Sequence, residues 1–199
     1  MKYLKLISLL FVAMLGSLFV SCEETAEVDE YANWQERNEE FIAAIAQEAK
    51  TNADGKWERI LAFNLNAVDA QGNPVEHGVD DYIYCHKVDE REGTENPKYT
   101  DFVSVNYRGR LIPTESQPKG MIFDESYKGT FNPAHNTPRH FFVNELIEGW
   151  STALMQMSKG DNWIIYIPST LGYGAQKKSD IPAYSTLIFD LNLVDFSKL

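Results

Sequence analysis

The sequence predicts an α+β domain in which several antiparallel strands pack against one short helix, with a longer helix in an extension before it. Two observations support this fold class. Segments in which apolar and polar residues alternate recur between turn signals from residue 79 onward, and this period of two is typical of half-buried strands. One short helical stretch interrupts them, where Trp150, Leu154 and Met157 share a face and Gly160 follows the last turn. We therefore expect the domain to span residues 79–199.

The composition indicates a folded, acidic protein. Hydrophobic residues make up 44% of the 199 residues and aromatic residues 13%, which is enough for one domain with a core and an accessory segment. There are 18 lysines and arginines against 29 aspartates and glutamates, which gives a net charge of -11. So acidic a surface repels phosphate backbones, and the sequence contains no basic patch with interleaved aromatic residues. We expect no nucleic-acid partner.

The first 21 residues are typical of an export signal. Lys2 and Lys5 give a positive start, and the apolar run of residues 6–20 is too short to span a membrane comfortably. The run ends in Phe-Val-Ser before Cys22, which resembles the lipobox of bacterial lipoproteins. The resemblance implies a lipoprotein signal peptide over residues 1–21, acylation of Cys22, and a lipid anchor in the bacterial cell envelope, on the periplasmic face or the cell surface. The alternatives are an ordinary signal peptide cut nearby and an uncleaved anchor.

Residues 22–78 are predicted to form an acidic tether followed by a helical extension. Residues 23–30 are acidic and polar, as in a solvated linker. The apolar residues between about 29 and 50 then recur at helical spacing: Tyr31, Trp34, Phe41, Ile42, Ile45 and Ala49. An apolar stripe of this kind has to be covered. Covering by the main domain of the same chain is the simpler expectation, and a homodimer through residues 29–50 is the alternative.

Strands and turns alternate through the rest of the chain. Residues 57–65 alternate imperfectly, residues 71–74 form a turn, and residues 82–88 form a strand. Further short runs of apolar residues predict strands at residues 102–107, 121–124, 140–143, 163–167 and 187–193. Loops that carry glycine and proline are expected at residues 113–120 and 127–138.

The cysteines and histidines show no pattern of metal binding or nucleophilic catalysis. With Cys22 assigned to lipid, Cys85 is the one remaining thiol and cannot form a disulfide within the domain. Its neighbour His86 would point to the opposite face of a strand, which argues against a Cys/His dyad. The four histidines lack metal-ligand spacing, so we expect neither a metal nor a cofactor: His77, His86, His135 and His140.

Six short motifs occur along residues 80–196 in the order seen in one family. They are Tyr107-Arg108-Gly109, Phe123-Asp124-Glu125-Ser126, Ile147-Glu148-Gly149-Trp150, the run from Leu154 to Gly160, Gly172-Tyr173-Gly174-Ala175, and Ile181-Pro182 followed by Ser185 to Asp190. Each motif alone is weakly specific, whereas six in order are strongly specific. In these motifs the chain resembles the FKBP-type peptidyl-prolyl cis-trans isomerases, in a bacterial lipoprotein form. The resemblance implies an antiparallel sheet wrapped over one short helix.

The resemblance also implies a proline-binding pocket with Trp150 as its floor. Its substrate-binding residues would be Phe123, Leu146, Ile147, Trp150, Ile181 and Phe189. Its catalytic residues would be Tyr107, Asp124 and Tyr173. Taken singly, each of these residues is better explained as an ordinary core or turn residue. Their joint order favours the pocket.

Such a pocket suits a reaction in which no bond is broken. Rotation about an X-Pro bond meets a barrier of about 18–20 kcal/mol because the planar amide is resonance-stabilised. A weakly polar pocket favours the twisted amide, whose charge separation is reduced. In this reading Tyr173 holds a carbonyl beside the proline, and Asp124 orients either Tyr107 or the carbonyl.

Two features depart from the pattern of the family. Arg139 occupies the position of an additional pocket aromatic, and Phe141 or Phe142 is the candidate replacement. The loops at residues 113–120 and 127–138 are longer than in the smallest members, so the resemblance does not determine the pocket rim.

The sequence therefore predicts an isomerase of proline-containing polypeptides that is anchored in the envelope and assists the folding of exported proteins. One alternative is a non-catalytic peptide-binding or chaperone module with the same fold, which Arg139 and the long loops favour. Another is an envelope scaffold that acts through dimerisation of the N-terminal helix.

Overall fold

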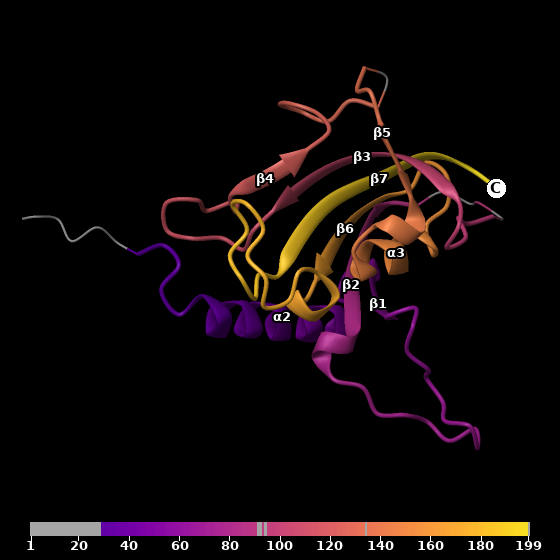
Figure 1. Cartoon of the computed structure of the whole chain (residues 1–199), viewed down its shortest axis with the longest axis horizontal. Coiled ribbons are helices and arrows are strands. Elements are labelled where there is room, and N and C mark those ends of the chain that lie inside the picture. Colours follow the sequence, from indigo (N-terminus) through magenta and orange to yellow (C-terminus); the bar gives the residue numbers. More distant parts are fainter. Residues whose placement is uncertain (1–28, 91–92, 94, 134, 199) are drawn as a thin grey trace, which may run out of the picture.

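The computed structural model describes residues 29–90, 93, 95–133 and 135–198, which form one sheet with a helix on each side (Figure 1). The α-helices are α2 (Trp34–Thr51) and α3 (Glu148–Leu154). The strands are β1 (Trp57–Leu61), β2 (Tyr82–Asp89), β3 (Phe102–Arg110), β4 (Ile122–Glu125), β5 (Arg139–Phe142), β6 (Asn162–Ile167) and β7 (Leu187–Ser197). Short 3₁₀ helices are η1 (Val79–Asp81), η2 (Val143–Glu145) and η3 (Ser169–Leu171). The predicted signal peptide at residues 1–21, Cys22 and the tether up to residue 28 lie outside the described residues.

All strand pairs are antiparallel, in the order β1-β2-β6-β7-β3-β4, with β5 also paired to β3. The α+β class with an N-terminal helix is therefore confirmed. The predicted strands are present, with boundaries shifted by a few residues. β1 pairs with β2 along its whole length, so the sheet begins at Trp57, inside the predicted extension.

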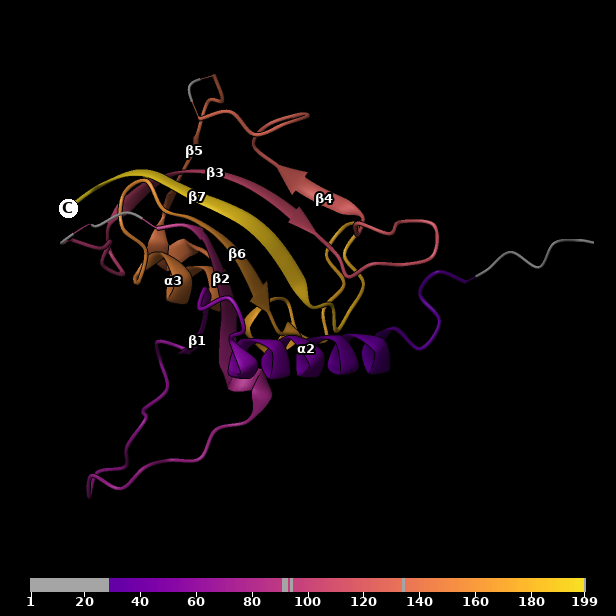
Figure 2. The ribbon, with the colours of Figure 1, turned by 180° about the vertical axis from the view of Figure 1, so that it is seen from behind.

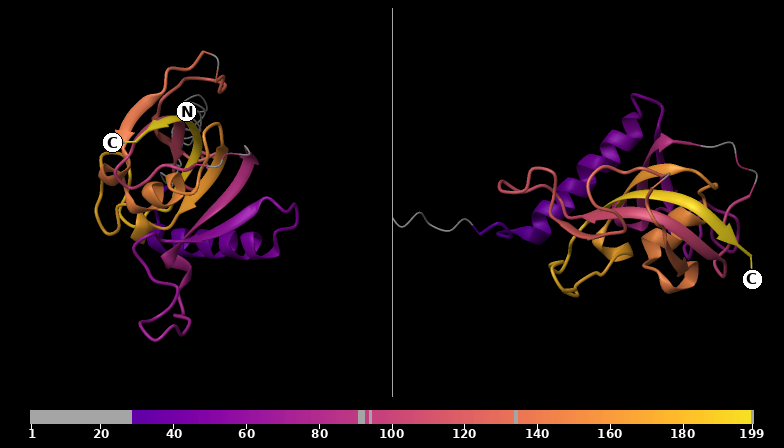
Figure 3. Two further views of the ribbon diagram at one scale, coloured as in Figure 1. Left: turned by 90° about the vertical axis from the view of Figure 1, so that its right-hand side faces the viewer. Right: turned by 90° about the horizontal axis from the view of Figure 1, so that it is seen from above.

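The two faces of the sheet follow from the alternation of side chains along each strand. Ile83 and Cys85 of β2 and Ile165 of β6 are fully buried in the main core, where α3 packs. Tyr84 and Tyr166, which alternate with them, belong to a second apolar cluster on the other face. Figure 3 shows α2 and α3 on opposite sides of the curved sheet.

Helix α2 covers the outer face with the apolar stripe that the sequence predicts. Ile42 and Ile45 are buried against Tyr84 and the rings around it, and burying each stabilises the fold by about 1.5–3 kcal/mol. The apolar stripe of α2 is therefore covered by the sheet of the same chain, which was the simpler of the two expectations from the sequence. The helix begins later than predicted because Asn33 has a left-handed φ of 51°, and residues 30–33 form a turn.

The start of α2 reaches beyond the outer face. Trp34 is 7% exposed and belongs to the main core rather than to the cluster around Tyr84. In Figure 2, the first turn of α2 lies under the loop that connects η3 with β7. None of the helices in the described part of the chain combines the length and the apolar character needed to cross a membrane.

Candidate active site

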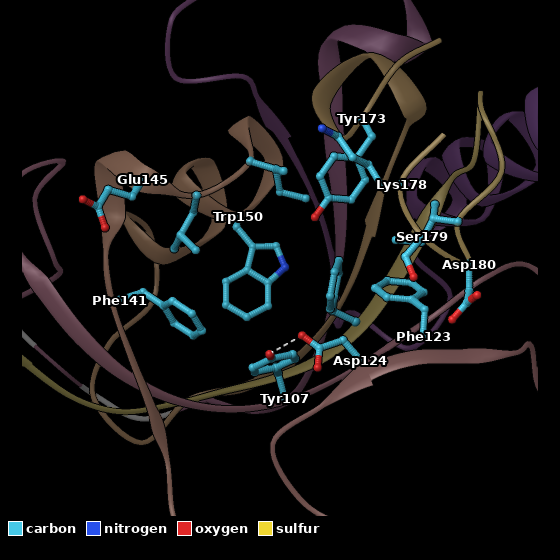
Figure 4. A pocket seen from close by; sticks show the side chains of 14 residues that line it. Tyr107, Phe123, Asp124, Phe141, Glu145, Trp150, Tyr173, Lys178, Ser179 and Asp180 are labelled. Carbon is cyan, nitrogen blue, oxygen red and sulfur yellow. Dashed lines mark hydrogen bonds between the residues drawn. The ribbon is translucent and has the colours of Figure 1, made fainter. Parts of the chain in front are cut away.

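A cavity of about 530 Å³ opens between α3, the inner face of the sheet and the loop before β7. Pockets of this size and apolar character are common binding sites for small groups. All nine pocket residues expected from the sequence line it (Figure 4). The complete lining is Tyr107, Phe123, Asp124, Phe141, Glu145, Leu146, Ile147, Trp150, Tyr173, Lys178, Ser179, Asp180, Ile181 and Phe189.

Trp150 lies at the base of the cavity, in the first turn of α3. Its ring meets Tyr107 edge-on at 5.0 Å between centroids and Phe189 at 5.1 Å, both at angles near perpendicular. Gly149 lets α3 approach the sheet closely, because a Cβ there would stand 2.4 Å from Cγ2 of Ile167. The glycine before the tryptophan therefore sets the depth of the cavity floor.

The indole N–H of Trp150 is buried and has no hydrogen-bond partner among the described residues. Buried polar groups without a partner are uncommon and often occur at functional sites. The sequence gives no signal for this feature, since it depends on which atoms surround the ring.

Phe123 and Phe189 form the wall beside Trp150. Their rings meet edge-to-face at 5.5 Å between centroids. Both rings lie against Gly109, where an added Cβ would stand 2.5 Å from Phe189 and 2.6 Å from Phe123. β3 places this glycine opposite Phe189 of β7 and Asp124 of β4, so the sheet register brings the wall together.

The polar corner of the cavity consists of Tyr107, Asp124 and Arg139. The Tyr107 hydroxyl donates to Oδ2 of Asp124 at 2.5 Å and accepts from Nη1 of Arg139 at 2.8 Å. The same Nη1 donates to Oδ1 of Asp124 at 3.1 Å, and Nη2 donates to the carbonyl of Glu125 at 2.9 Å. Burial raises the pKa of Tyr107, and the hydrogen bond to the Asp124 carboxylate raises it further. Tyr107 is therefore a neutral hydroxyl held in one orientation.

Tyr173 faces the cavity from the opposite side. Its hydroxyl points toward Trp150 and forms no hydrogen bond within the described part of the chain (Figure 4). Burial raises the pKa of Tyr173, with a smaller contribution from Asp124. A neutral, unpaired phenol in this position can donate a hydrogen bond to a bound carbonyl.

Phe141, one of the two candidates that the sequence offered for an additional pocket aromatic, lines the cavity. Arg139 and Phe141 are two residues apart on β5 and therefore share a face. The Phe141 ring lies 6.1 Å from Trp150 and 6.2 Å from Tyr107 between centroids. The Phe142 ring instead packs against Phe102, with 4.9 Å between the ring centroids. The alternation of side chains along a strand could have distinguished Phe141 from Phe142 on the basis of the sequence.

Four lining residues were not anticipated from the sequence: Glu145, Lys178, Ser179 and Asp180. They come from a 3₁₀ turn and a loop, where no periodicity marks which side chains face inward. Their nearness in sequence to Leu146 and Ile181 is the one available signal. Among the described residues, no three His, Cys, Asp or Glu side chains are grouped so that they could hold a metal ion.

Comparisons with known proteins agree with this geometry. A family model described as FKBP-type peptidyl-prolyl cis-trans isomerase matches residues 93–194. The chain is 37% identical over 114 residues to the peptidyl-prolyl cis-trans isomerase Mip of Coxiella burnetii, an alignment that covers 57% of this chain and 44% of that protein. It is 35% identical over 182 residues to the macrophage infectivity potentiator of Trypanosoma cruzi, covering 91% and 79% of the two chains.

The fold also resembles a solved structure. The crystal structure of the three FKBP domains of wheat FKBP73 aligns with a TM-score of 0.50 and 30% identity, over 61% of this chain and 49% of that one. The chain spans about half the length of several bacterial relatives that it matches.

Proposed function

Because the chain belongs to the FKBP-type peptidyl-prolyl cis-trans isomerase family, we propose that it catalyses rotation about X-Pro bonds in proline-containing polypeptides. The observation that supports this most strongly is the apolar cavity floored by Trp150 with the Tyr107–Asp124 pair at its edge. A proline ring is apolar and compact, and the edges of the surrounding aromatic rings would hold it without any reactive group. Rotation needs no nucleophile, so the chemistry consists of binding the twisted amide better than the planar one.

Each polar group at the cavity has a separate role in this proposal. The Tyr173 hydroxyl, which has no partner within the described part of the chain, donates to a carbonyl that flanks the proline. Asp124 acts through Tyr107, because its carboxylate accepts from that hydroxyl at 2.5 Å and keeps the ring in place. Ile181 and Leu146 exclude water from the ring face.

A protease-coupled isomerisation assay on the chain from Glu23 onward tests the proposal. We expect acceleration above the spontaneous rate, and we expect Asp124→Ala and Tyr173→Phe to lower turnover while the circular dichroism spectrum is retained. Tyr99→Phe is the matched control, because Tyr99 is 44% exposed and its ring lies tilted against Phe63, 5.0 Å between centroids, outside the cavity lining. No acceleration by the unaltered chain would refute the enzymatic function, and unchanged turnover in both variants would remove the two assigned roles.

Arg139 favours a second candidate function, a non-catalytic peptide-binding or chaperone module. Its guanidinium binds both Tyr107 and Asp124, so the polar corner is already paired without a substrate. Calorimetry with a proline-containing peptide distinguishes the two functions. Binding without any rate enhancement would select the module, whereas rate enhancement selects the enzyme.

We further propose that the protein is a lipoprotein of the bacterial envelope that assists the folding of exported proteins. The apolar run before Cys22 and its resemblance to a lipobox support this. Labelling of bacterial cells with an alkyne-tagged fatty acid should tag the protein, and Cys22→Ser should lose both the tag and membrane association. A tag that persists in Cys22→Ser would contradict the assignment.

The homodimer through residues 29–50, and with it the scaffold function, stays a prediction with weaker support. The stripe that motivated it is covered by the sheet of the same chain. Sedimentation at high concentration measures the oligomeric state directly, and a monomer would count against both.

A further inference from the structure

The rim of the cavity is formed in part by residues 178–186, the loop that precedes β7. Lys178, Ser179, Asp180 and Ile181 of this loop line the cavity. Ser179 has a φ of 46° and Tyr184 a φ of 60°, in the left-handed region that residues with a Cβ rarely adopt. A loop with two such residues keeps one conformation only when its surroundings hold it there.

Helix α2 supplies the hydrogen bonds that hold the end of this loop. Oδ1 of Asn38 accepts the backbone N–H of Thr186 at 2.7 Å, and its Nδ2 donates to the carbonyl of Trp34 at 2.7 Å. The indole N–H of Trp34 donates to Oγ of Ser185 at 2.8 Å, and that hydroxyl donates to the carbonyl of Pro182 at 2.7 Å. Asn38 therefore joins the helix directly to the loop backbone.

These contacts are closed to water. Asn38 is 2% exposed, Thr186 is 1% exposed and Ser185 is 4% exposed. If the amide of Asn38 is removed, water cannot easily replace it, and the Thr186 N–H loses its acceptor. Thr186 is followed at once by β7, whose Phe189 forms the cavity wall. A change at Asn38 would thus reach both the rim and the wall.

The residues before α2 contact a second loop, the one between β3 and β4. The Tyr31 hydroxyl lies 3.6 Å from Sδ of Met121, and Oε1 of Glu30 accepts the N–H of Ser116 at 3.2 Å. That loop leads into β4, which carries Phe123 and Asp124. Residues 30–38 therefore contact both the loop before β7, which lines the cavity, and the loop before β4, which leads to two cavity residues.

We propose that Asn38 is a positioning residue for the proline pocket, so that α2 is part of the binding unit and not merely a spacer between the domain and its anchor. This inference rests on the proposed isomerase function. Loosening the loop weakens contacts that planar and twisted amides share, because Ile181 grips the proline ring in both. We therefore expect the loss of Asn38 to raise KM and leave kcat nearly unchanged.

The matched control is Asn52, at the other end of the same helix. Its amide also makes two hydrogen bonds, with the N–H and the carbonyl of Trp57, but on the outer face and away from the cavity. Asn38→Ala and Asn52→Ala each remove two side-chain hydrogen bonds. Asn52 is the C-cap of α2 and has a left-handed φ of 45°, so its alanine variant also strains the backbone and perturbs the helix at least as much as Asn38→Ala does. Trp34→Phe provides a milder second variant, because it keeps an aromatic ring and removes the N–H that reaches Ser185.

The experiment measures kcat, KM and backbone hydrogen exchange on the full-length chain. We expect Asn38→Ala to raise KM about threefold to tenfold, with kcat within about twofold, and Trp34→Phe to change KM in the same direction. Amide exchange in residues 178–186 should accelerate about tenfold in Asn38→Ala and stay unchanged in Asn52→Ala. Unchanged exchange in that loop, or an equal rise in KM in Asn52→Ala, would overturn the inference.

The two proposals fail in different ways. If the unaltered chain gives no rate enhancement, the isomerase function fails, and the calorimetric Kd for a proline-containing tetrapeptide replaces KM. A Kd raised in Asn38→Ala but not in Asn52→Ala, together with faster loop exchange, would then support the positioning role. If the unaltered chain is active and folded Asn38→Ala behaves like it, the positioning role fails and the isomerase function stands.

Discussion

Gly109→Ala tests the assembly of the cavity wall through a single methyl group. The added Cβ would stand 2.5 Å from Cε1 of Phe189 and 2.6 Å from Cε2 of Phe123, whereas carbon atoms pack at about 3.5–4.0 Å. Each ring has to move by roughly 1 Å, and overpacking of this kind costs about 1–3 kcal/mol. The smaller entropy of the unfolded alanine chain offsets about 0.4–1 kcal/mol. The net loss in the free energy of unfolding should be about 1–2 kcal/mol.

Urea titration measures this loss as a midpoint lowered by roughly 0.5–1 M at constant slope. The displaced rings also narrow the cavity, so kcat/KM should fall by about tenfold, which corresponds to about 1.4 kcal/mol of transition-state binding. Gly78→Ala is the control, since the nearest atom to its added Cβ is Oδ2 of Asp81 at 3.8 Å. If Gly109→Ala matches this control in both midpoint and kcat/KM, the rings do not lie where the cavity requires them. Combination with Phe123→Leu should restore part of the lost stability, because the smaller side chain leaves room for the methyl group.

Two further predictions concern titratable groups. Hydrogen bonds from Lys128, and next from Arg108, hold the pKa of Glu125 below its ordinary value of 4.5. The ionised Glu125 carboxylate therefore stabilises the fold fully above pH 4.5, and this stabilisation is lost as the pH falls through the lowered pKa. Glu125→Gln should therefore lower the free energy of unfolding by about 1 kcal/mol at pH 7 and leave it unchanged at a pH where the wild-type carboxyl is protonated. Urea unfolding at both pH values measures the difference. An equal loss at low pH would contradict the ion-pair explanation. Cys85 is fully buried and burial raises the pKa of its thiol, so iodoacetamide should leave it unmodified in a folded Cys22→Ser chain and modify it in concentrated urea. Rapid modification of the folded chain would show that β2 opens or lies elsewhere.

The polar corner shows how a departure from a family pattern can be accommodated. The resemblance to the family led us to expect an aromatic at the position of Arg139, and Phe141, on the same face of β5, lies beside Trp150 in the cavity wall. The guanidinium also pairs with Asp124, whose carboxylate otherwise accepts a hydrogen bond from the Tyr107 hydroxyl at the edge of the apolar cavity. The Arg139 guanidinium also donates to the Tyr107 hydroxyl, and this hydrogen bond helps to fix the orientation of the Tyr107 ring.

The sequence by itself determined the elements and most of the cavity lining. Strand and helix periods are local properties, so the alternation in β3, β6 and β7 and the helical spacing around Trp150 identify which residues face inward without knowledge of their partners. The order of six motifs then grouped Tyr107, Phe123, Trp150 and Phe189 into one site, and the structure brings these residues together.

Only the tertiary structure decided what surrounds that site. The hydrogen bond between Asn38 and Thr186 joins residues 148 positions apart. The indole N–H of Trp150 has no partner among the residues that the structure describes, and this depends on every atom packed around it. Residues 178–180 face the cavity from a loop that contains left-handed residues, and in such a loop no regular spacing of apolar residues predicts which side chains point inward. Contacts of this kind follow from how the elements pack, and for that reason a pattern along the chain predicts the floor of the cavity but not the helix that holds its rim.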